Sequence, residues 1–211
     1  MAEANRFEKP GVRGWLHRPA KVKAAMLLSH GAGGDCRSAL MVAVATAFAE
    51  AGYCVLRWDL PFRQARPRGA PGSGERDREG IRMAAGELRQ LAPGVPLYLS
   101  GQSYGGRQSS MVAAEDTELA AGLLLLSYPL HPPGKPTQLR IEHFGLLRMP
   151  VLFVHGTRDP FGSVDELKKA VQLIPGPAKV EVVEGAGHGV PPATAPSMPE
   201  WFAATLVRDH D

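Results

Sequence analysis

The stretch "LYLSGQSYGG", residues 97–106, joins an apolar run to a serine that has glycines on both sides. The run at 97–100 predicts a buried strand, and the residues after the serine begin a helical pattern. Glycine lacks a Cβ, so it fits where a strand and a helix pack closely across a sharp bend. Ser103, at the centre of this bend, is therefore a candidate nucleophile, and the alternative is an ordinary turn residue.

Six apolar runs along the chain predict strands. Most are continuously apolar rather than alternating, which is typical of strands buried on both faces of a parallel sheet. The last run alternates more, as expected of a strand nearer a sheet edge. Residues 7–18 are expected to add one or two short strands. The six runs occupy residues 24–30, 53–60, 96–100, 122–129, 150–156 and 179–185.

Helical patterns separate these runs, at residues 37–52, 75–94, 105–116, 163–176 and 199–209. Ser163, with Glu166 three residues later, has the pattern of a capping box. Alternating strands and helices predict an α/β fold, with a mostly parallel central sheet of about six to eight strands and helices on both faces. We expect a single domain over residues 1–211. Two segments, 61–75 and 131–140, look irregular, and both follow strands at the edge where open α/β sheets bind ligands.

The composition is that of a globular protein, with 44% hydrophobic and 21% charged residues in 211. No apolar run approaches the ~20 residues that span a bilayer, and residues 1–10 have no signal-peptide core. We therefore expect a cytoplasmic protein without membrane contact. The net charge of +3 is mild, and the arginines between 57 and 82 are mixed with acidic residues, which argues against nucleic-acid binding.

The cysteines and histidines do not indicate a metal or redox centre. Two cysteines, Cys36 and Cys54, are too few for a disulfide framework, and Cys54 lies inside an apolar run. The seven histidines are scattered, and none stands with cysteine at the spacing of metal ligands. We expect neither a metal nor a cofactor.

A serine hydroxyl is a weak nucleophile until a base removes its proton. His188, in the glycine-rich "EGAGHGV" after the last predicted strand, is the candidate base. Asp159, in "HGTRDPF" after the preceding strand, is the candidate for orienting the imidazole, with Asp59 as the alternative. Because parallel strands end at one edge of a sheet, we predict that Ser103, Asp159 and His188 form a catalytic triad.

Attack on a carbonyl creates a negative oxygen that backbone N–H groups can stabilise. The N–H of Tyr104, directly after the serine, is the first predicted donor of this oxyanion hole. The second is expected in "HGAGG", residues 30–34, because its glycines let the backbone turn inward. Ala32 is the predicted donor, and Gly33 is the alternative.

In their order along the chain, "HGAGG", "GQSYGG", "HGTRDPF" and "GAGHG" resemble the oxyanion, nucleophile, acid and base segments of small α/β-hydrolases, close to the dienelactone-hydrolase-like group. The resemblance covers residues 24–208. The stretch "LSYPLHPPGKP", residues 126–136, further resembles an uncharacterised branch that includes hydrolase-like domains of an animal testis-expressed protein and of a histone-acetyltransferase-complex subunit. Dienelactone hydrolases have cysteine where this chain has Ser103, and no insertion is long enough for a large lid.

Three further residues are candidate substrate contacts. Gly33 borders the predicted oxyanion hole, His131 lies on the proline-rich rim, and Arg63 lies in the loop after residues 53–60. An arginine there suits an anionic substrate, and a solvated loop is the alternative. His30 and His155 are instead expected to hold the loops around the site in place.

Together these features predict a serine hydrolase that acts on a small soluble carboxylic ester or thioester through an acyl-enzyme. The alternative is a non-catalytic or weakly active protein-interaction module with the same fold, because a fold does not determine a function. Acyl transfer or perhydrolysis by the same three residues also stays open, as do the identity of the acyl group and the oligomeric state.

Overall fold

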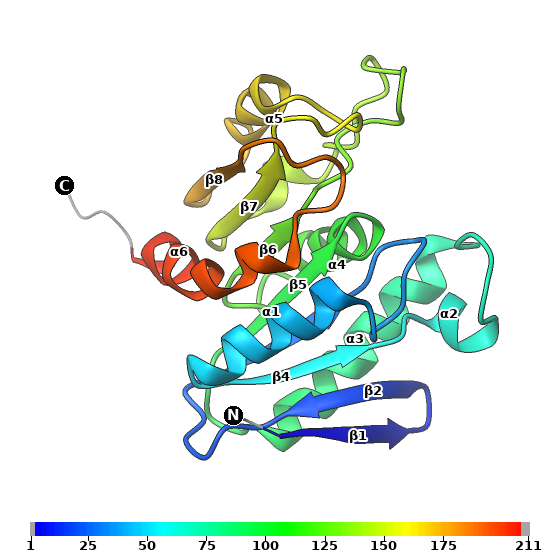
Figure 1. Ribbon diagram of the computed structural model, residues 1–211, viewed down its shortest axis with the longest axis vertical. Coiled ribbons are helices and arrows are strands. Elements are labelled where there is room, and N and C mark those ends of the chain that lie inside the picture. Colours follow the sequence, from blue (N-terminus) through cyan, green and yellow to red (C-terminus); the bar gives the residue numbers. More distant parts are fainter. Residues whose placement is uncertain (1–2, 208–211) are drawn as a thin grey trace.

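A single eight-stranded sheet organises residues 3–207, the part of the chain that the computed structural model describes (Figure 1). The strands are β1 (Ala4–Lys9), β2 (Val12–His17), β3 (Ala24–Ser29), β4 (Tyr53–Trp58), β5 (Leu97–Gln102), β6 (Leu123–Leu126), β7 (Val151–Gly156) and β8 (Ala178–Val183). Their order across the sheet is β1-β2-β4-β3-β5-β6-β7-β8. The β1–β2 and β2–β4 pairs are antiparallel, whereas all other neighbours are parallel. The carboxyl ends of β3 to β8 therefore lie along one edge.

The expected α/β fold with a mostly parallel sheet is confirmed. Each of the six apolar runs overlaps one of the strands β3 to β8, and the N-terminal stretch forms the β1–β2 hairpin. β3, β6 and β7 are buried along their whole length, as continuous apolar strands inside a parallel sheet should be. β8, whose sequence alternates, is only partly buried and lies at the edge of the sheet.

Helices cover both faces of the sheet. They are α1 (Ala39–Glu50), α2 (Pro61–Ala65), α3 (Gly74–Leu91), α4 (Tyr104–Glu115), α5 (Val164–Val171) and α6 (Met198–Leu206), with short 3₁₀ helices η1 (Phe144–Leu146) and η2 (Pro192–Ser197). One apolar cluster joins the sheet to α3, α4 and α5, and a second joins it to α1 and α6. Alternate residues of β3 enter the two clusters, Leu27 the first and Leu28 the second. Figure 1 shows α1 and α6 in front of the sheet.

Two local expectations have different outcomes. The capping box of α5 is confirmed, because the Ser163 side chain accepts a hydrogen bond from the Glu166 N–H at 3.3 Å and the Glu166 carboxylate accepts one from the Ser163 N–H at 2.8 Å. The prediction that residues 61–75 are irregular is wrong for their first five, which form α2. Pro61 begins this helix, where its missing N–H costs nothing. Asp77 accepts the Phe62 N–H at 3.0 Å and ties α2 to α3.

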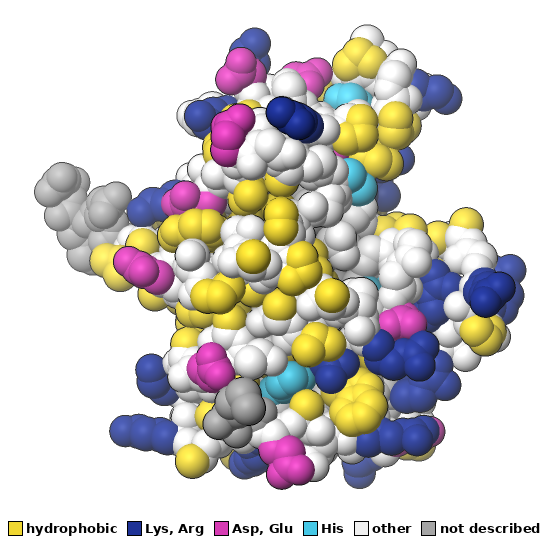
Figure 2. All heavy atoms as spheres, in the orientation of Figure 1, with side chains coloured by type: hydrophobic (Ala, Val, Ile, Leu, Met, Phe, Trp, Pro, Cys, Tyr) yellow, Lys and Arg dark blue, Asp and Glu magenta, His cyan; other side chains and the backbone are white. Residues whose placement is uncertain are grey.

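The basic residues on the surface are partly neutralised by acidic neighbours. Figure 2 shows Lys and Arg side chains gathered over the region of α2 and the nearby hairpin. In this region Arg37 pairs with Asp35 at 2.9 Å and Arg13 pairs with Asp59 at 3.4 Å. Within residues 3–207, no helix has both the length and the apolar character needed to cross a membrane.

A buried pair between β2 and β4 makes the stability of the fold depend on pH. The Arg57 Nε–H on β4 donates a hydrogen bond of 2.8 Å to Nε2 of His17 on β2, which holds the imidazole in its neutral form. Burial, and secondly the Arg57 cation, lower the pKa of His17 to about 4. An unfolded histidine takes up a proton near pH 6.5, so between pH 6.5 and 4 the unfolded chain binds the proton and the folded chain does not.

We expect the free energy of unfolding to fall by about 2 kcal/mol through this histidine between pH 7 and pH 5. Urea unfolding at the two pH values measures the total decrease. In His17→Gln the amide oxygen still accepts from Arg57, but nothing titrates, so the decrease should be smaller by about that amount. An equal decrease in the variant and the wild type would contradict this assignment.

Candidate active site

Ser103 is the one residue between β5 and α4, and it has a backbone conformation that residues with a side chain rarely adopt. Its φ is +48° and its ψ is −114°. A non-glycine residue at positive φ is strained, and such strain is typical of the elbow that presents a nucleophile above an α/β sheet. The hydroxyl consequently lies at the N-terminus of α4, where the helix dipole favours negative charge.

The glycines around Ser103 allow the strand and the helix to cross closely. A Cβ on Gly101 would lie 2.5 Å from the backbone nitrogen of Gly106, and a Cβ on Gly106 would lie 2.5 Å from the carbonyl oxygen of Gly101. A Cβ on Gly105 would overlap the carbonyl oxygen of His30 at the end of the neighbouring β3. These glycines therefore set the distance between the nucleophile turn and the loop predicted to complete the oxyanion hole.

The structure brings together the three residues of the predicted triad. The Ser103 Oγ lies 2.7 Å from Nε2 of His188, and Nδ1 of His188 lies 2.9 Å from both carboxylate oxygens of Asp159. The carboxylate accepts the Nδ1–H, which leaves Nε2 to accept the serine proton. Ser103 follows β5, Asp159 follows β7 and His188 follows β8, so the sheet edge places all three.

Contacts on every side hold Asp159 in place. Its side chain has no exposure to solvent, while that of His188 retains 25%. One Asp159 oxygen also accepts the N–H of Phe161 at 2.8 Å. Nε2 of His155, on β7, lies 2.8 Å from the carbonyl oxygen of Gly162 and so closes the loop that carries Asp159. This is the structural role expected of His155, and the arrangement limits Asp159 to orienting the imidazole.

The loop after β3 and the start of α4 place the two predicted oxyanion donors, Ala32 and Tyr104, around the serine. Ala32 and Tyr104 line the same cavity as Ser103 and His188. Within residues 3–207, neither of their N–H groups donates a hydrogen bond to another backbone group. Gly33, the alternative donor and a candidate substrate contact, also lines this cavity. His30 holds the loop at its base: its Nδ1 lies 2.8 Å from the Gly31 carbonyl oxygen, and its Nε2 accepts the Leu60 N–H at 3.1 Å.

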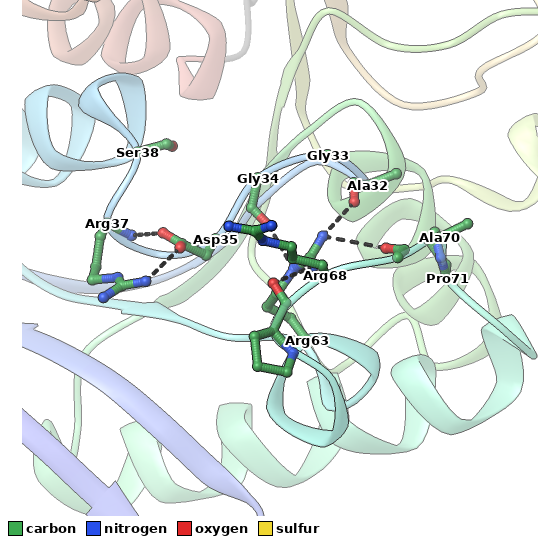
Figure 3. Close-up of a pocket in the computed structure, with 12 residues that line it drawn as sticks. Ala32, Gly33, Gly34, Asp35, Arg37, Ser38, Arg63, Arg68, Ala70 and Pro71 are labelled. Atoms are coloured by element: carbon green, nitrogen blue, oxygen red, sulfur yellow. Dashed lines mark hydrogen bonds and ion pairs between the residues drawn. The ribbon is translucent and has the colours of Figure 1, made fainter.

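The Arg63 side chain is hydrogen-bonded to backbone carbonyls of the protein, and these contacts do not support its expected role in binding substrate. Its guanidinium donates to the carbonyl oxygens of Ala32 at 2.7 Å, Gly34 at 2.9 Å and Pro67 at 2.9 Å. Figure 3 shows this side chain between the loop after β3 and the loop after α2, and it is only 7% exposed. Arg63 therefore fixes the carbonyl side of the Ala32 peptide, which leaves the N–H side for the cavity.

Two other sequence-based candidates lie away from the triad. His131 is buried, with Nδ1 2.8 Å from the Pro132 carbonyl oxygen and Nε2 3.7 Å from a carboxylate oxygen of Glu166. It does not line the cavity that contains Ser103, so its expected contact with substrate is not supported. Asp59, the alternative to Asp159, accepts the Cys36 N–H at 2.9 Å and pairs with Arg13.

The cavity at Ser103 has a volume of about 700 Å³, within the range of small-molecule sites. A second cavity of about 940 Å³ adjoins it, lined by residues of the loop after β3 and of the loop after α2 (Figure 3). Neither Ser103 nor His188 lines the larger cavity, although the two cavities share Ala32, Gly33, Gly34, Ser38 and Pro71. The smaller cavity is the candidate active site, because it contains Ser103, the candidate nucleophile.

Among the cavity-lining residues that sequence reasoning missed are an aromatic residue and two arginines. The ring of Phe161 stacks on the imidazole of His188, with centroids 3.8 Å apart and planes at 26°. Its position two residues after Asp159 was the available signal. Arg107 and Arg140 also line the cavity. Arg107 lies one helical turn after Ser103, and Arg140 ends the proline-rich segment that was expected to border the site.

A serine on a strained strand-to-helix turn, with a histidine and a buried aspartate at neighbouring strand ends, defines the active-site architecture of an α/β-hydrolase. The family described as alpha/beta hydrolase domain matches residues 22–198, so this chain belongs to the α/β-hydrolases.

Solved structures share this fold over nearly the whole chain. The protein TT1662 from Thermus thermophilus is 22% identical, with a TM-score of 0.78 and 98% of each chain covered. Dienelactone hydrolase from Anabaena variabilis is 20% identical, with a TM-score of 0.77 and coverage of 97% of this chain and 99% of that one. The protein XC6422 from Xanthomonas campestris, described as a serine hydrolase without lid, is 18% identical, with a TM-score of 0.67 and coverage of 97% and 88%. At these identities the likeness shows the fold alone. In residues 3–207 of this chain, too, no insertion forms a large lid.

Gly101→Ala should disrupt the close packing between the end of β5 and the start of α4. The new methyl group would meet backbone atoms that have no room to move, so we expect a loss of about 2 kcal/mol of stability or more. Gly86→Ala is the matched control: it adds the same methyl group on α3, with nothing within 4 Å. Alanine favours a helix over glycine, so this variant should gain about 0.5 kcal/mol or more. Urea unfolding midpoints measure both, and equal effects of the two variants would contradict a tight crossing at Gly101.

Proposed function

We propose that this protein is a serine hydrolase of small soluble carboxylic esters or thioesters, with Ser103, His188 and Asp159 as its catalytic triad. The observation that carries this proposal is the continuous chain of contacts from the Ser103 hydroxyl through the imidazole to the buried Asp159 carboxylate. In a purely structural turn, a backbone carbonyl would be a sufficient hydrogen-bond acceptor for the serine hydroxyl, and no histidine–aspartate pair would be needed.

In the proposed reaction, the Ser103 Oγ attacks the substrate carbonyl carbon while Nε2 of His188 takes the hydroxyl proton. The N–H groups of Tyr104 and Ala32 stabilise the oxygen that becomes negative, and Asp159 stabilises the imidazolium. The tetrahedral intermediate then expels the alcohol or thiol, which receives the proton from His188 and leaves an acyl-enzyme. Water, activated by the same imidazole, releases the acid and restores Ser103.

Two features support water as the acceptor and a small substrate. The His188 side chain is 25% exposed and lines the cavity, so solvent reaches the imidazole that must activate the second nucleophile. The cavity of about 700 Å³ has no large cover in the described chain, and long acyl chains would project into water.

Labelling with a fluorophosphonate probe, which reacts with an activated serine, tests this proposal. We expect the wild type to label and to turn over p-nitrophenyl acetate or butyrate. Both properties should be lost in Ser103→Ala, by a factor of roughly 10³ or more in turnover. Ser197→Ala is the matched control, because Ser197 is exposed and its side chain makes no capping hydrogen bond. Its labelling and turnover should equal those of the wild type.

A folded wild type that neither labels nor hydrolyses either ester would overturn the enzyme proposal. It would favour the interaction module expected from the resemblance of residues 126–136 to the branch with testis-expressed and histone-acetyltransferase-complex proteins. Labelling without ester turnover would instead retain the activated serine and direct attention to an acceptor other than water.

A further inference from the structure

The cavity at Ser103 carries positive charge that the triad does not use. Two arginines line it, Arg107 from α4 and Arg140 from the segment between β6 and η1, and no aspartate or glutamate lines it with them. Neither arginine forms an ion pair with a carboxylate of residues 3–207. The cavity therefore presents two permanent cations beside Ser103, and neither is in ion-pair contact with a carboxylate of the described chain.

Arg107 is also incompletely hydrogen-bonded. Its Nε is buried and has no hydrogen-bond partner in the described chain. The other inward-facing arginines are well paired: Arg63 donates to three backbone carbonyls, and Arg57 donates to His17 and to the Cys36 carbonyl oxygen. A guanidinium that lines a cavity and has no carboxylate partner in the described chain leaves its charge uncompensated, so the accessible part of this side chain points to a ligand that supplies an acceptor.

Arg140 lies close enough to Arg107 for the two charges to repel each other. Within residues 3–207, its side chain makes one hydrogen bond, a long one of 3.5 Å to the Pro129 carbonyl oxygen. Burial, and secondly the Arg107 cation, lower the pKa of Arg140. Its backbone is nevertheless fixed, since its N–H donates to Leu130 at 2.8 Å and its carbonyl accepts the Tyr128 hydroxyl at 2.6 Å. The fold thus holds two like charges beside one cavity, an arrangement that a bound anion would stabilise.

We propose that Arg107 and Arg140 bind an anionic group, a carboxylate or a phosphate, on the substrate whose ester bond Ser103 attacks. This inference rests on the proposed hydrolase function and names the class of substrate for the same site. Planar guanidinium groups suit such anions because two N–H donors can meet two oxygens. Arg107 lies four residues after Ser103 on α4, hence one turn away on the same side of the helix. The anionic group is therefore expected near the reacting carbonyl, on a short substrate, and it takes no part in the covalent steps.

Matched pairs of esters test this proposal in the wild type. The first pair is mono-p-nitrophenyl glutarate, with an acyl carboxylate, and neutral p-nitrophenyl pentanoate. The second is 4-acetoxybenzoate, with a carboxylate on the leaving group, and its methyl ester. We expect the anionic member of at least one pair to have the higher kcat/KM, by about tenfold or more. The pair that shows the preference identifies the side of the ester bond that the arginines face.

Arg107→Gln and Arg140→Gln should each lower this anionic-to-neutral ratio by about tenfold. The ratio within one variant is compared, so a general loss of activity does not mimic the result, and thermal unfolding checks that each variant is folded. Arg148→Gln is the control: it removes the same charge from an exposed position at the opposite end of the strands, and its ratio should equal that of the wild type. An unchanged ratio in both cavity variants, or no preference in either pair, would overturn the proposal.

A binding measurement separates failure of this inference from failure of the hydrolase proposal. Glutarate and 3-phosphonopropionate are titrated calorimetrically into Ser103→Ala, with and without Arg107→Gln. We expect at least one to bind, and its Kd to rise by about tenfold with the second substitution. The better ligand distinguishes a carboxylate from a phosphate site. Arginine-dependent binding without serine labelling or turnover would support the anion site and reject the hydrolase proposal. Turnover without arginine-dependent binding would support the hydrolase proposal and reject the anion site.

Discussion

The close crossing of β5 and α4 is the constraint on which the candidate site depends. Gly101 and Gly106 let the two backbones approach to distances that no Cβ tolerates, and Gly105 does the same between α4 and the end of β3. Ser103, the one residue that joins β5 to α4, has a φ of +48°. That conformation costs free energy locally. It also directs the hydroxyl away from the sheet, to the point where the free N–H groups of α4 begin. The bend is stable because the strands on both sides of β5 hold it in register.

The sheet then brings distant residues to this bend without requiring long side chains. Ser103, Asp159 and His188 are separated by up to 85 residues along the chain, yet each follows a parallel strand at the same edge. Burial differs among them in a way that suits their proposed roles. Asp159 is fully enclosed and bonded, so it has a fixed orientation, whereas His188 is partly open to the water that must be activated. Phe161 stacks on the imidazole and restricts its rotation.

The fold and the placement of the triad could be predicted because they depend on local signals. Continuous apolar runs mark buried strands, and the segments that follow them mark one sheet edge, which is how His188 and Asp159 were located. The partners of long side chains depend on tertiary structure instead. Arg63 lies in the expected loop, but the neighbouring carbonyls of Ala32, Gly34 and Pro67 take its donors. His131 turns toward Glu166 on α5, a contact that no local pattern indicates.

The hydrogen-bond partners of an arginine, rather than its exposure, distinguish one that holds the backbone in place from one that is available to bind substrate. Arg63 and Arg107 both lie near the site, and both are at least partly buried. Arg63 has carbonyl acceptors on two loops, so its charge serves to fix the backbone that offers the Ala32 N–H. Arg107 has a buried Nε without an acceptor and a second arginine beside it. Folding alone favours neither feature, because both desolvation and like-charge repulsion oppose it. A substrate that brings its own negative charge reduces the repulsion between the two arginines, and the same charge would hold the reacting carbonyl beside Ser103.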